Sequence, residues 1–138
     1  MASVEKEIVI EAPVEDVWAI IGDFGQGPIR MAPGFVVDSR LAEPDLRIVT
    51  FADGTVVHER LIALDDAKQR FVFSIVGGSV TPIHDNATMR VFPHDDGHSR
   101  FVWTHDVLPA ELADAFGASM EQGLLLFKRT VESAAVDS

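Results

Sequence analysis

The sequence contains no cysteine and no tyrosine among its 138 residues. The absence of cysteine excludes disulfides, thiol nucleophiles and zinc sites with cysteine ligands. The absence of tyrosine removes a phenolic side chain that enzymes use as an acid or as a donor to an oxyanion. Acid/base chemistry in this chain would therefore rest on its histidines and carboxylates.

Basic side chains are also scarce, because 11 lysines and arginines oppose 22 aspartates and glutamates and give a formal net charge of −11. Phosphate backbones and anionic membrane surfaces repel such a chain, so we expect no nucleic-acid partner. No apolar run approaches the roughly 18 residues that a membrane helix needs, so we expect no stable membrane insertion. The first residues do not resemble a signal peptide, and we expect a cytoplasmic protein.

Alternating polar and apolar residues predict a first strand over residues 4–11 and six further strands before residue 109. Short turn segments separate the six predicted strands, for example at Asp53-Gly54, at 77–82 and at 93–97. Such short connections make neighbouring strands antiparallel. The six predicted strands lie near 35–42, 46–52, 55–65, 69–76, 84–93 and 98–108.

Two helical patterns complete the chain. After Pro13, apolar residues at helical spacing predict a short helix that ends near Gly22, and 25–34 predicts a loop with one short helical turn. Residues 110–135 predict one long helix, because apolar residues recur there at intervals of three or four. These features predict one domain over 1–138 with an α+β fold, in which about seven antiparallel strands form a strongly curved sheet around the long C-terminal helix.

Five short segments in a fixed order span nearly the whole chain, and these are residues 8–18, 22–24, 59–66, 73–75 and 101–103. In these segments the sequence resembles the START-like superfamily, also called SRPBCC or helix-grip, and within it the polyketide cyclase/dehydrase-like branch. The middle of the chain also has a distant likeness to plant abscisic-acid receptors, whose glutamate in a Glu-Arg-Leu motif faces the ligand cavity. Glu59 matches that glutamate, so the resemblance implies that Glu59 faces a cavity.

Strand alternation predicts which other side chains face this cavity. On the last strand, Trp103 and His105 share the more apolar face, and on the strand before it Asp85 shares a face with Met89. The predicted ligand-binding residues, including three from the long helix, are Glu59, Leu61, Phe71, Phe73, Ile75, Asp85, Ala87, Met89, Phe101, Trp103, His105, Phe116, Met120 and Leu124.

Three of these side chains are polar, and they leave three readings open. Glu59, Asp85 and His105 are candidate catalytic residues, because a histidine and a carboxylate form an acid/base pair suited to closing or dehydrating a polyketone. Alternatively they are a hydrated polar anchor for a hydroxyl or carbonyl group of a ligand. In the third reading, Asp85 and His105 lie exposed at strand ends and have no role.

We therefore expect a binding or carrier protein for a small apolar or amphipathic ligand such as a lipid, polyketide or isoprenoid. The alternatives are an enzyme of the polyketide cyclase, aromatase or dehydratase type that uses the same cavity, and a regulatory module whose loops at 52–55 and 77–83 close over the ligand. We expect no cofactor and no metal. Residues 94–98 contain metal-ligand residue types, but their pattern favours a hairpin turn over a metal site. Monomer and homodimer both remain open.

Overall fold

A computed structural model describes the backbone of residues 2–137 and the side chains of residues 2–134. Seven strands, three α-helices and a short 3-10 turn follow one another along the chain. Their order is β1 (Ala2–Ile10), α1 (Val14–Ile21), α2 (Gly27–Met31), β2 (Val36–Glu43), β3 (Leu46–Phe51), β4 (Val56–Asp65), β5 (Arg70–Gly78), β6 (His84–His94), β7 (His98–Leu108), the 3-10 turn Ala110–Leu112 and α3 (Ala113–Asp137).

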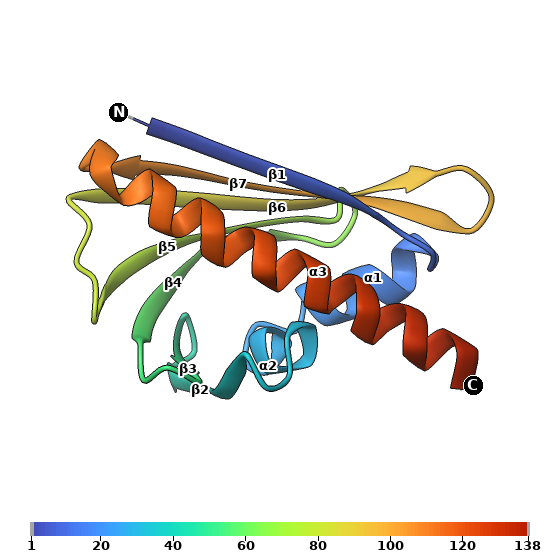
Figure 1. The fold of residues 1–138 in the computed structure, drawn as a ribbon, viewed down its shortest axis with the longest axis horizontal. Coiled ribbons are helices and arrows are strands. Elements are labelled where there is room, and N and C mark those ends of the chain that lie inside the picture. Colours follow the sequence, from blue (N-terminus) through green and yellow to red (C-terminus); the bar gives the residue numbers. More distant parts are fainter. Residues whose placement is uncertain (1, 138) are drawn as a thin grey trace.

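The strands form one antiparallel sheet in the order β1-β7-β6-β5-β4-β3-β2. Strands β2 to β7 follow a simple meander, and β1 pairs with β7 at the far edge. The sheet is strongly curved, and α3 runs across its inner side from the ends of β1 and β7 past α2 (Figure 1). The predicted helix-grip architecture is confirmed.

The helices differ slightly from their predicted bounds. Helix α1 begins directly after Pro13 and buries Val17, Trp18 and Ile21. The expected helical turn in the following loop is the five-residue helix α2. The predicted long helix starts with a 3-10 turn at Ala110 before α3 proper. No helix within residues 2–137 is long and apolar enough to cross a membrane.

The break predicted at Gly77 and Gly78 is wrong, because these two glycines continue β5 instead of ending it. Gly78 has a φ of 103°, and a Cβ atom there would lie 2.3 Å from the carbonyl oxygen of Val56. Only glycine lets the two backbones approach so closely. The glycine pair therefore lets β5 stay paired with β4, with Gly78 opposite Val57 and Gly77 opposite His58.

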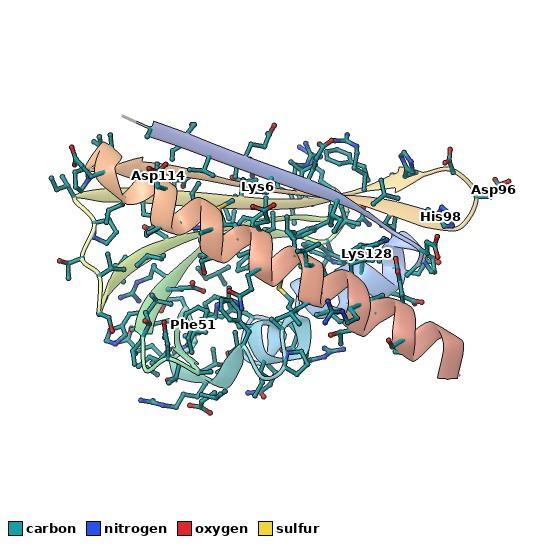
Figure 2. The ribbon with its side chains drawn as sticks, viewed as in Figure 1. Lys6, Phe51, Asp96, His98, Asp114 and Lys128 are labelled. Carbon is teal, nitrogen blue, oxygen red and sulfur yellow. The ribbon has the colours of Figure 1, made fainter. Side chains whose placement is uncertain are left out.

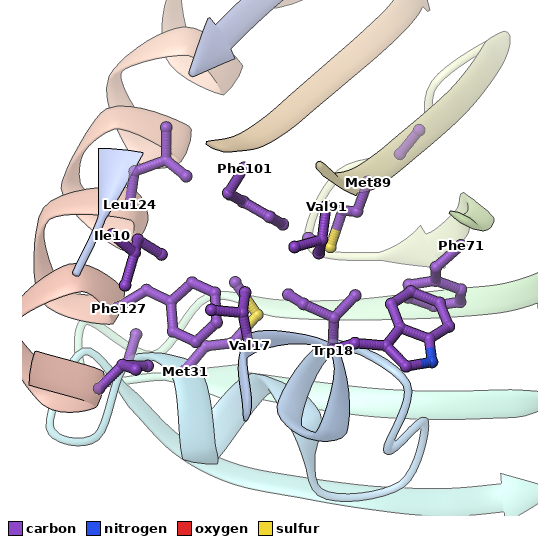
Figure 3. Packing of buried hydrophobic residues seen from close by; sticks show 14 of the residues in the cluster. Ile10, Val17, Trp18, Met31, Phe71, Met89, Val91, Phe101, Leu124 and Phe127 are labelled. Atoms are coloured by element: carbon purple, nitrogen blue, oxygen red, sulfur yellow. The ribbon is translucent and has the colours of Figure 1, made fainter. Parts of the chain in front are cut away.

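The solid core lies under the C-terminal half of α3. Figure 3 shows Leu124 and Phe127 of the helix facing Ile10, Val17 and Phe101. The rings of Phe101 and Phe127 meet edge to face with their centres 5.5 Å apart. Both rings are fully buried, and each such side chain contributes about 1.5–3 kcal/mol. This packing fixes the helix on the sheet.

Polar contacts tie the same half of α3 to the end of β1. Lys128 donates from Nζ to the carbonyl oxygen of Val9 at 2.8 Å and lies 2.6 Å from Oε2 of Glu132. Oε2 of Glu132 in turn accepts the backbone N–H of Glu11 at 2.8 Å. Figure 2 shows Lys128 on the helix beside the end of the first strand. The C-terminal half of α3 is therefore held by both packing and hydrogen bonds.

Candidate ligand-binding site

A pocket of about 370 Å³ lies between the N-terminal half of α3 and the inner face of the sheet. Its volume falls within the range of about 300–1,000 Å³ that is usual for small-molecule sites. Exposed Asp53 and Ala115 lie among its lining residues and mark its rim. The apolar part of the lining includes Met31, Phe35, Val49, Phe51, Val57, Phe73, Ile75, Val80, Met89, Trp103, Leu112, Phe116 and Met120.

An ion pair between Arg47 and Glu59 lies in the wall of this pocket. The two residues face each other directly across β3 and β4, so their side chains emerge on the same face of the sheet. Arg47 donates from Nε to Oε1 of Glu59 at 2.8 Å and from Nη1 to the carbonyl oxygen of Phe24 at 3.1 Å. Only 4% of the arginine side chain and 10% of the glutamate side chain are exposed. The pair therefore compensates two charges that would be costly to bury alone.

Aromatic rings hold the guanidinium of Arg47 in place. Its central carbon lies 4.9 Å from the ring centre of Phe24 and 5.1 Å from the ring centres of both Phe71 and Phe73. These distances are within the range of cation–π attraction. Neither Oε2 of Glu59 nor Nη2 of Arg47 has a hydrogen-bond partner among the described residues. Both atoms belong to pocket-lining residues, so they are available to a ligand.

A second polar pair joins Asp85 of β6 to His105 of β7. Nδ1 of His105 lies 2.7 Å from Oδ1 of Asp85, and the backbone N–H of Ile75 donates to Oδ2 of the same carboxylate at 2.8 Å. The Asp85 side chain is completely buried. Because a carboxylate only accepts, Nδ1 carries the proton in this contact. Asp85 therefore holds the imidazole ring in one orientation and one tautomer.

The imidazole of His105 presents its other nitrogen among aromatic rings. The ring centres of Phe73, Trp103 and Phe116 lie 5.8, 5.9 and 5.2 Å from the centre of the imidazole. Nε2 has no hydrogen-bond partner among residues 2–134, and His105 lines the pocket. The indole nitrogen of Trp103 also lacks a partner there, but protein atoms enclose it. Nε2 is therefore the nitrogen that a ligand can reach.

The rim of the pocket carries a fixed negative charge at Asp53. The backbone N–H of Thr55 donates to Oδ1 of Asp53 at 2.9 Å. This hydrogen bond holds the pKa of the exposed carboxyl below its ordinary value. Asp53 therefore stays ionised at neutral pH and disfavours the approach of anions.

The structure separates the sequence-predicted site residues into two groups. Eight of them border the pocket, and these are Glu59, Phe73, Ile75, Met89, Trp103, His105, Phe116 and Met120. Six others do not border it, and these are Leu61, Phe71, Asp85, Ala87, Phe101 and Leu124. Asp85 is buried behind His105, and the reading that placed it and His105 at an exposed rim does not fit their burial. The role of the bordering residues in binding remains a prediction.

Sequence reasoning missed Arg47, which is the most important addition to the site. Arg47 shares the inner face of β3 with Val49 and Phe51. That alternation is visible in the sequence, but an arginine on an apolar face gains meaning only when its partner is known. The partner, Glu59, is set by the register of the β3–β4 hairpin.

The histidines and aspartates of residues 94–98 lie away from the pocket. They form the β6–β7 hairpin, whose turn has positive φ angles at Asp95 and Gly97. In Figure 2, Asp96 and His98 lie at the tip of this hairpin, at the opposite end of the molecule from the pocket-lining Phe51. The turn predicted for this segment is therefore present.

A family described as polyketide cyclase / dehydrase and lipid transport matches residues 1–132. The chain belongs to this family. The sequence resemblance to the polyketide cyclase/dehydrase-like branch is thereby confirmed, whereas the likeness to abscisic-acid receptors remains a prediction.

Several solved structures share the fold of this chain. An uncharacterised protein of Bacillus thuringiensis is 20% identical, with a TM-score of 0.84 over 94% of this chain and 98% of that one. A Thermobifida fusca protein is 27% identical, with a TM-score of 0.75 over 95% of this chain and 93% of that one. The di-domain ARO/CYC BexL of the BE-7585A biosynthetic pathway is 17% identical, with a TM-score of 0.81 over 96% of this chain and 47% of that one. Comparison with proteins of curated function gives no match.

Proposed function

We propose that this protein binds a small, mostly apolar molecule in the pocket between α3 and the sheet. The observation that carries the proposal is the combination of a pocket of about 370 Å³, mainly apolar walls and two buried polar pairs whose free atoms belong to its lining. Apolar walls supply affinity, and a few fixed polar groups supply orientation. The ligand is therefore amphipathic, with its polar groups at Glu59 and His105.

The family supports this class of ligand. Its description names both cyclases or dehydrases and lipid transport, and both activities require a protein that encloses a largely apolar molecule. The positions of Glu59 and His105 also support an amphipathic ligand, because keeping polar atoms without partners beside an apolar space costs free energy. Polar groups in such places normally have partners, and a bound ligand would provide the partners that the protein itself does not.

Titration with an uncharged fluorescent probe, N-phenyl-1-naphthylamine, tests this proposal. The wild-type protein should bind one equivalent saturably. Ser119 lines the pocket from α3, so Ser119→Phe should fill part of the space and weaken binding at least tenfold. Ala118 is exposed on the same helix, and Ala118→Phe serves as the matched control that binds as wild type does. Absence of saturable binding to the wild type, or equal binding by both variants, would contradict the proposal.

A second function, acid/base catalysis on the bound molecule, is favoured by the contact between Asp85 and His105. A buried carboxylate that orients a histidine is an arrangement that enzymes use to position a proton acceptor. In such a reaction, Nε2 of His105 would take a proton from the substrate and return it. Mass spectra of small molecules recovered from the protein distinguish the functions, since a carrier releases its ligand unchanged and an enzyme releases a product.

A further inference from the structure

We infer that the ligand is an uncharged molecule with two separated hydroxyl groups, one for Nε2 of His105 and one for the Arg47–Glu59 pair. This inference rests on the proposed function, because it names the chemistry of the molecule that occupies the same pocket. It separates hydroxylated ligands from fatty acids and from ligands whose polar groups are only carbonyls.

The first hydroxyl follows from the tautomer of His105. Nδ1 donates its proton to Asp85, whose other oxygen already accepts the N–H of Ile75. In the uncharged ring, Nε2 is then a hydrogen-bond acceptor. An acceptor facing the pocket pairs with an O–H group of the ligand, and neither a carbonyl nor an ether can donate to it.

The second hydroxyl follows from what Arg47 and Glu59 leave free. The free oxygen of Glu59, Oε2, requires a donor, whereas the free nitrogen of Arg47, Nη2, requires an acceptor. A hydroxyl group is both donor and acceptor, so it can pair with both atoms at once. A carbonyl can pair only with the guanidinium, and it would leave the carboxylate oxygen without a partner.

The two polar sites are separated along the sheet that forms the pocket wall. Glu59 is on β4 and His105 is on β7, with β5 and β6 between them, so three strand spacings of about 4.8 Å separate their backbones. The ring of Phe73 lies between the sites, with its centre 5.1 Å from the guanidinium carbon of Arg47 and 5.8 Å from the imidazole centre. The hydroxyls therefore belong at opposite sides of the ligand and not on adjacent carbons.

An anionic ligand does not fit this charge arrangement. Among the residues whose side chains the structure describes, the only guanidinium that lines the pocket is that of Arg47, which is already neutralised by Glu59. Asp53 keeps a negative charge at the rim, and the whole chain carries a formal net charge of −11. A carboxylate in the pocket would have no cation of its own and would be repelled on entry.

A ligand series on one ring system tests the inference on the wild-type protein. We would measure binding of naphthalene-2,6-diol, its monomethyl ether and its dimethyl ether by calorimetry, with 6-hydroxy-2-naphthoate as the anionic analogue. Each lost donor should weaken binding about tenfold, because an acceptor is left without a partner. The naphthoate should bind more weakly than the diol by at least the same factor.

The outcomes separate this inference from the proposed function. If the dimethyl ether or the naphthoate binds as tightly as the diol, the inference is overturned and the proposed function stands. If neither the series nor N-phenyl-1-naphthylamine binds saturably, the proposed function fails and the inference fails with it.

The variant Asp85→Asn tests the tautomer without changing the pocket wall, because Asp85 does not border the pocket. The carbonyl of the new amide would accept the N–H of Ile75, and its NH₂ group would donate to Nδ1 of His105. The ring proton then moves to Nε2, which becomes a donor. The tenfold preference for the diol over the monomethyl ether should therefore disappear. Asp66→Asn is the control, because it makes the same change at an exposed aspartate that accepts a hydrogen bond from Trp18. This control should keep the preference for the diol.

Long-range proton–nitrogen NMR spectra of protein labelled at histidine provide a measurement that needs no ligand. The wild-type spectrum should show the His105 ring protonated at Nδ1 and not at Nε2. Asp85→Asn, if it folds, should show protonation at Nε2. A wild-type ring that is protonated at Nε2 would overturn the inference.

Discussion

The two halves of helix α3 face the same sheet, but one half packs into the core and the other half borders the pocket. The C-terminal half buries Phe127 and Val131 in a solid core and is tied to β1 through Lys128. The N-terminal half faces a pocket, and its Phe116 and Met120 line an open space instead of filling it. One continuous helix thus has a packed end and an open end.

This difference shows how a small domain keeps a ligand space. A pocket removes contacts that would otherwise stabilise the fold, so the missing stability must come from elsewhere. Here the packed end supplies it, with Ile10, Val17, Phe101 and Phe127 almost wholly buried. We therefore expect substitutions at the packed end to change stability and substitutions at the open end to change binding.

The largest effect on stability should come from replacing phenylalanine by alanine, and two separate variants compare this change at the packed end and at the open end of α3. Phe127→Ala should destabilise the protein by about 3–5 kcal/mol, because it leaves a cavity in a tight core. Phe116→Ala should cost only about 1–1.5 kcal/mol, since the ring is half-buried beside existing space. Urea unfolding gives both values, and probe titration should show weakened binding only for Phe116→Ala. Equal destabilisation would mean that the two ends are packed alike.

The next effect concerns the ion pair in the pocket wall. Arg47→Met should destabilise the protein by about 3 kcal/mol, because it leaves the Glu59 carboxylate without its cation in an apolar wall. The double variant Arg47→Met/Glu59→Leu should recover much of that stability. It should lose the binding preference for the hydroxyl group at this pair and keep the preference for the one at His105. Urea unfolding of the wild type, Arg47→Met, Glu59→Leu and the double variant completes a thermodynamic cycle. Strictly additive losses would show that the two side chains do not interact.

The sequence carries the fold more clearly than the site. Alternation along the strands and the stripe through Phe116, Met120, Leu124 and Phe127 predict a curved sheet around one helix. The same stripe cannot tell the packed end from the open end, because all four residues are equally apolar. That distinction depends on which sheet residues meet each turn of the helix, and this is set by strand register.

The polar pairs illustrate the same limit. Alternation predicts that Asp85 and His105 face inward, but not that they meet. Their contact arises from a diagonal step across β6 and β7, where Ala87 and not Asp85 stands opposite His105. Arg47 was missed for a related reason, because its pairing with Glu59 depends on the β3–β4 register.

The smallest expected effect tests the polar ties of the packed end and depends on pH. Burial alone raises the pKa of Glu132, but the N–H of Glu11 and the ammonium of Lys128 outweigh it and hold the pKa below its ordinary value. The folded protein thus favours the ionised carboxylate more than the unfolded chain does. The resulting stability is present above the unfolded pKa and is lost as the pH falls through the lower folded pKa.

Glu132→Gln should therefore lower stability by up to about 1 kcal/mol at neutral pH, because the carboxylate is partly exposed and its pairing is screened. The difference in stability between the variant and the wild type should disappear in acid, where both side chains are uncharged.

Glu121→Gln is the control, since Glu121 lies 3.7 Å from Lys6 and is mostly exposed. This control substitution should leave stability nearly unchanged. Urea unfolding at about pH 7 and at about pH 3 measures both variants on either side of the carboxylate titration. Probe binding at neutral pH should match the wild type for both, because Glu132 acts at the packed end. A gap that persists in acid would mean that Glu132 acts through its shape and packing instead of its charge.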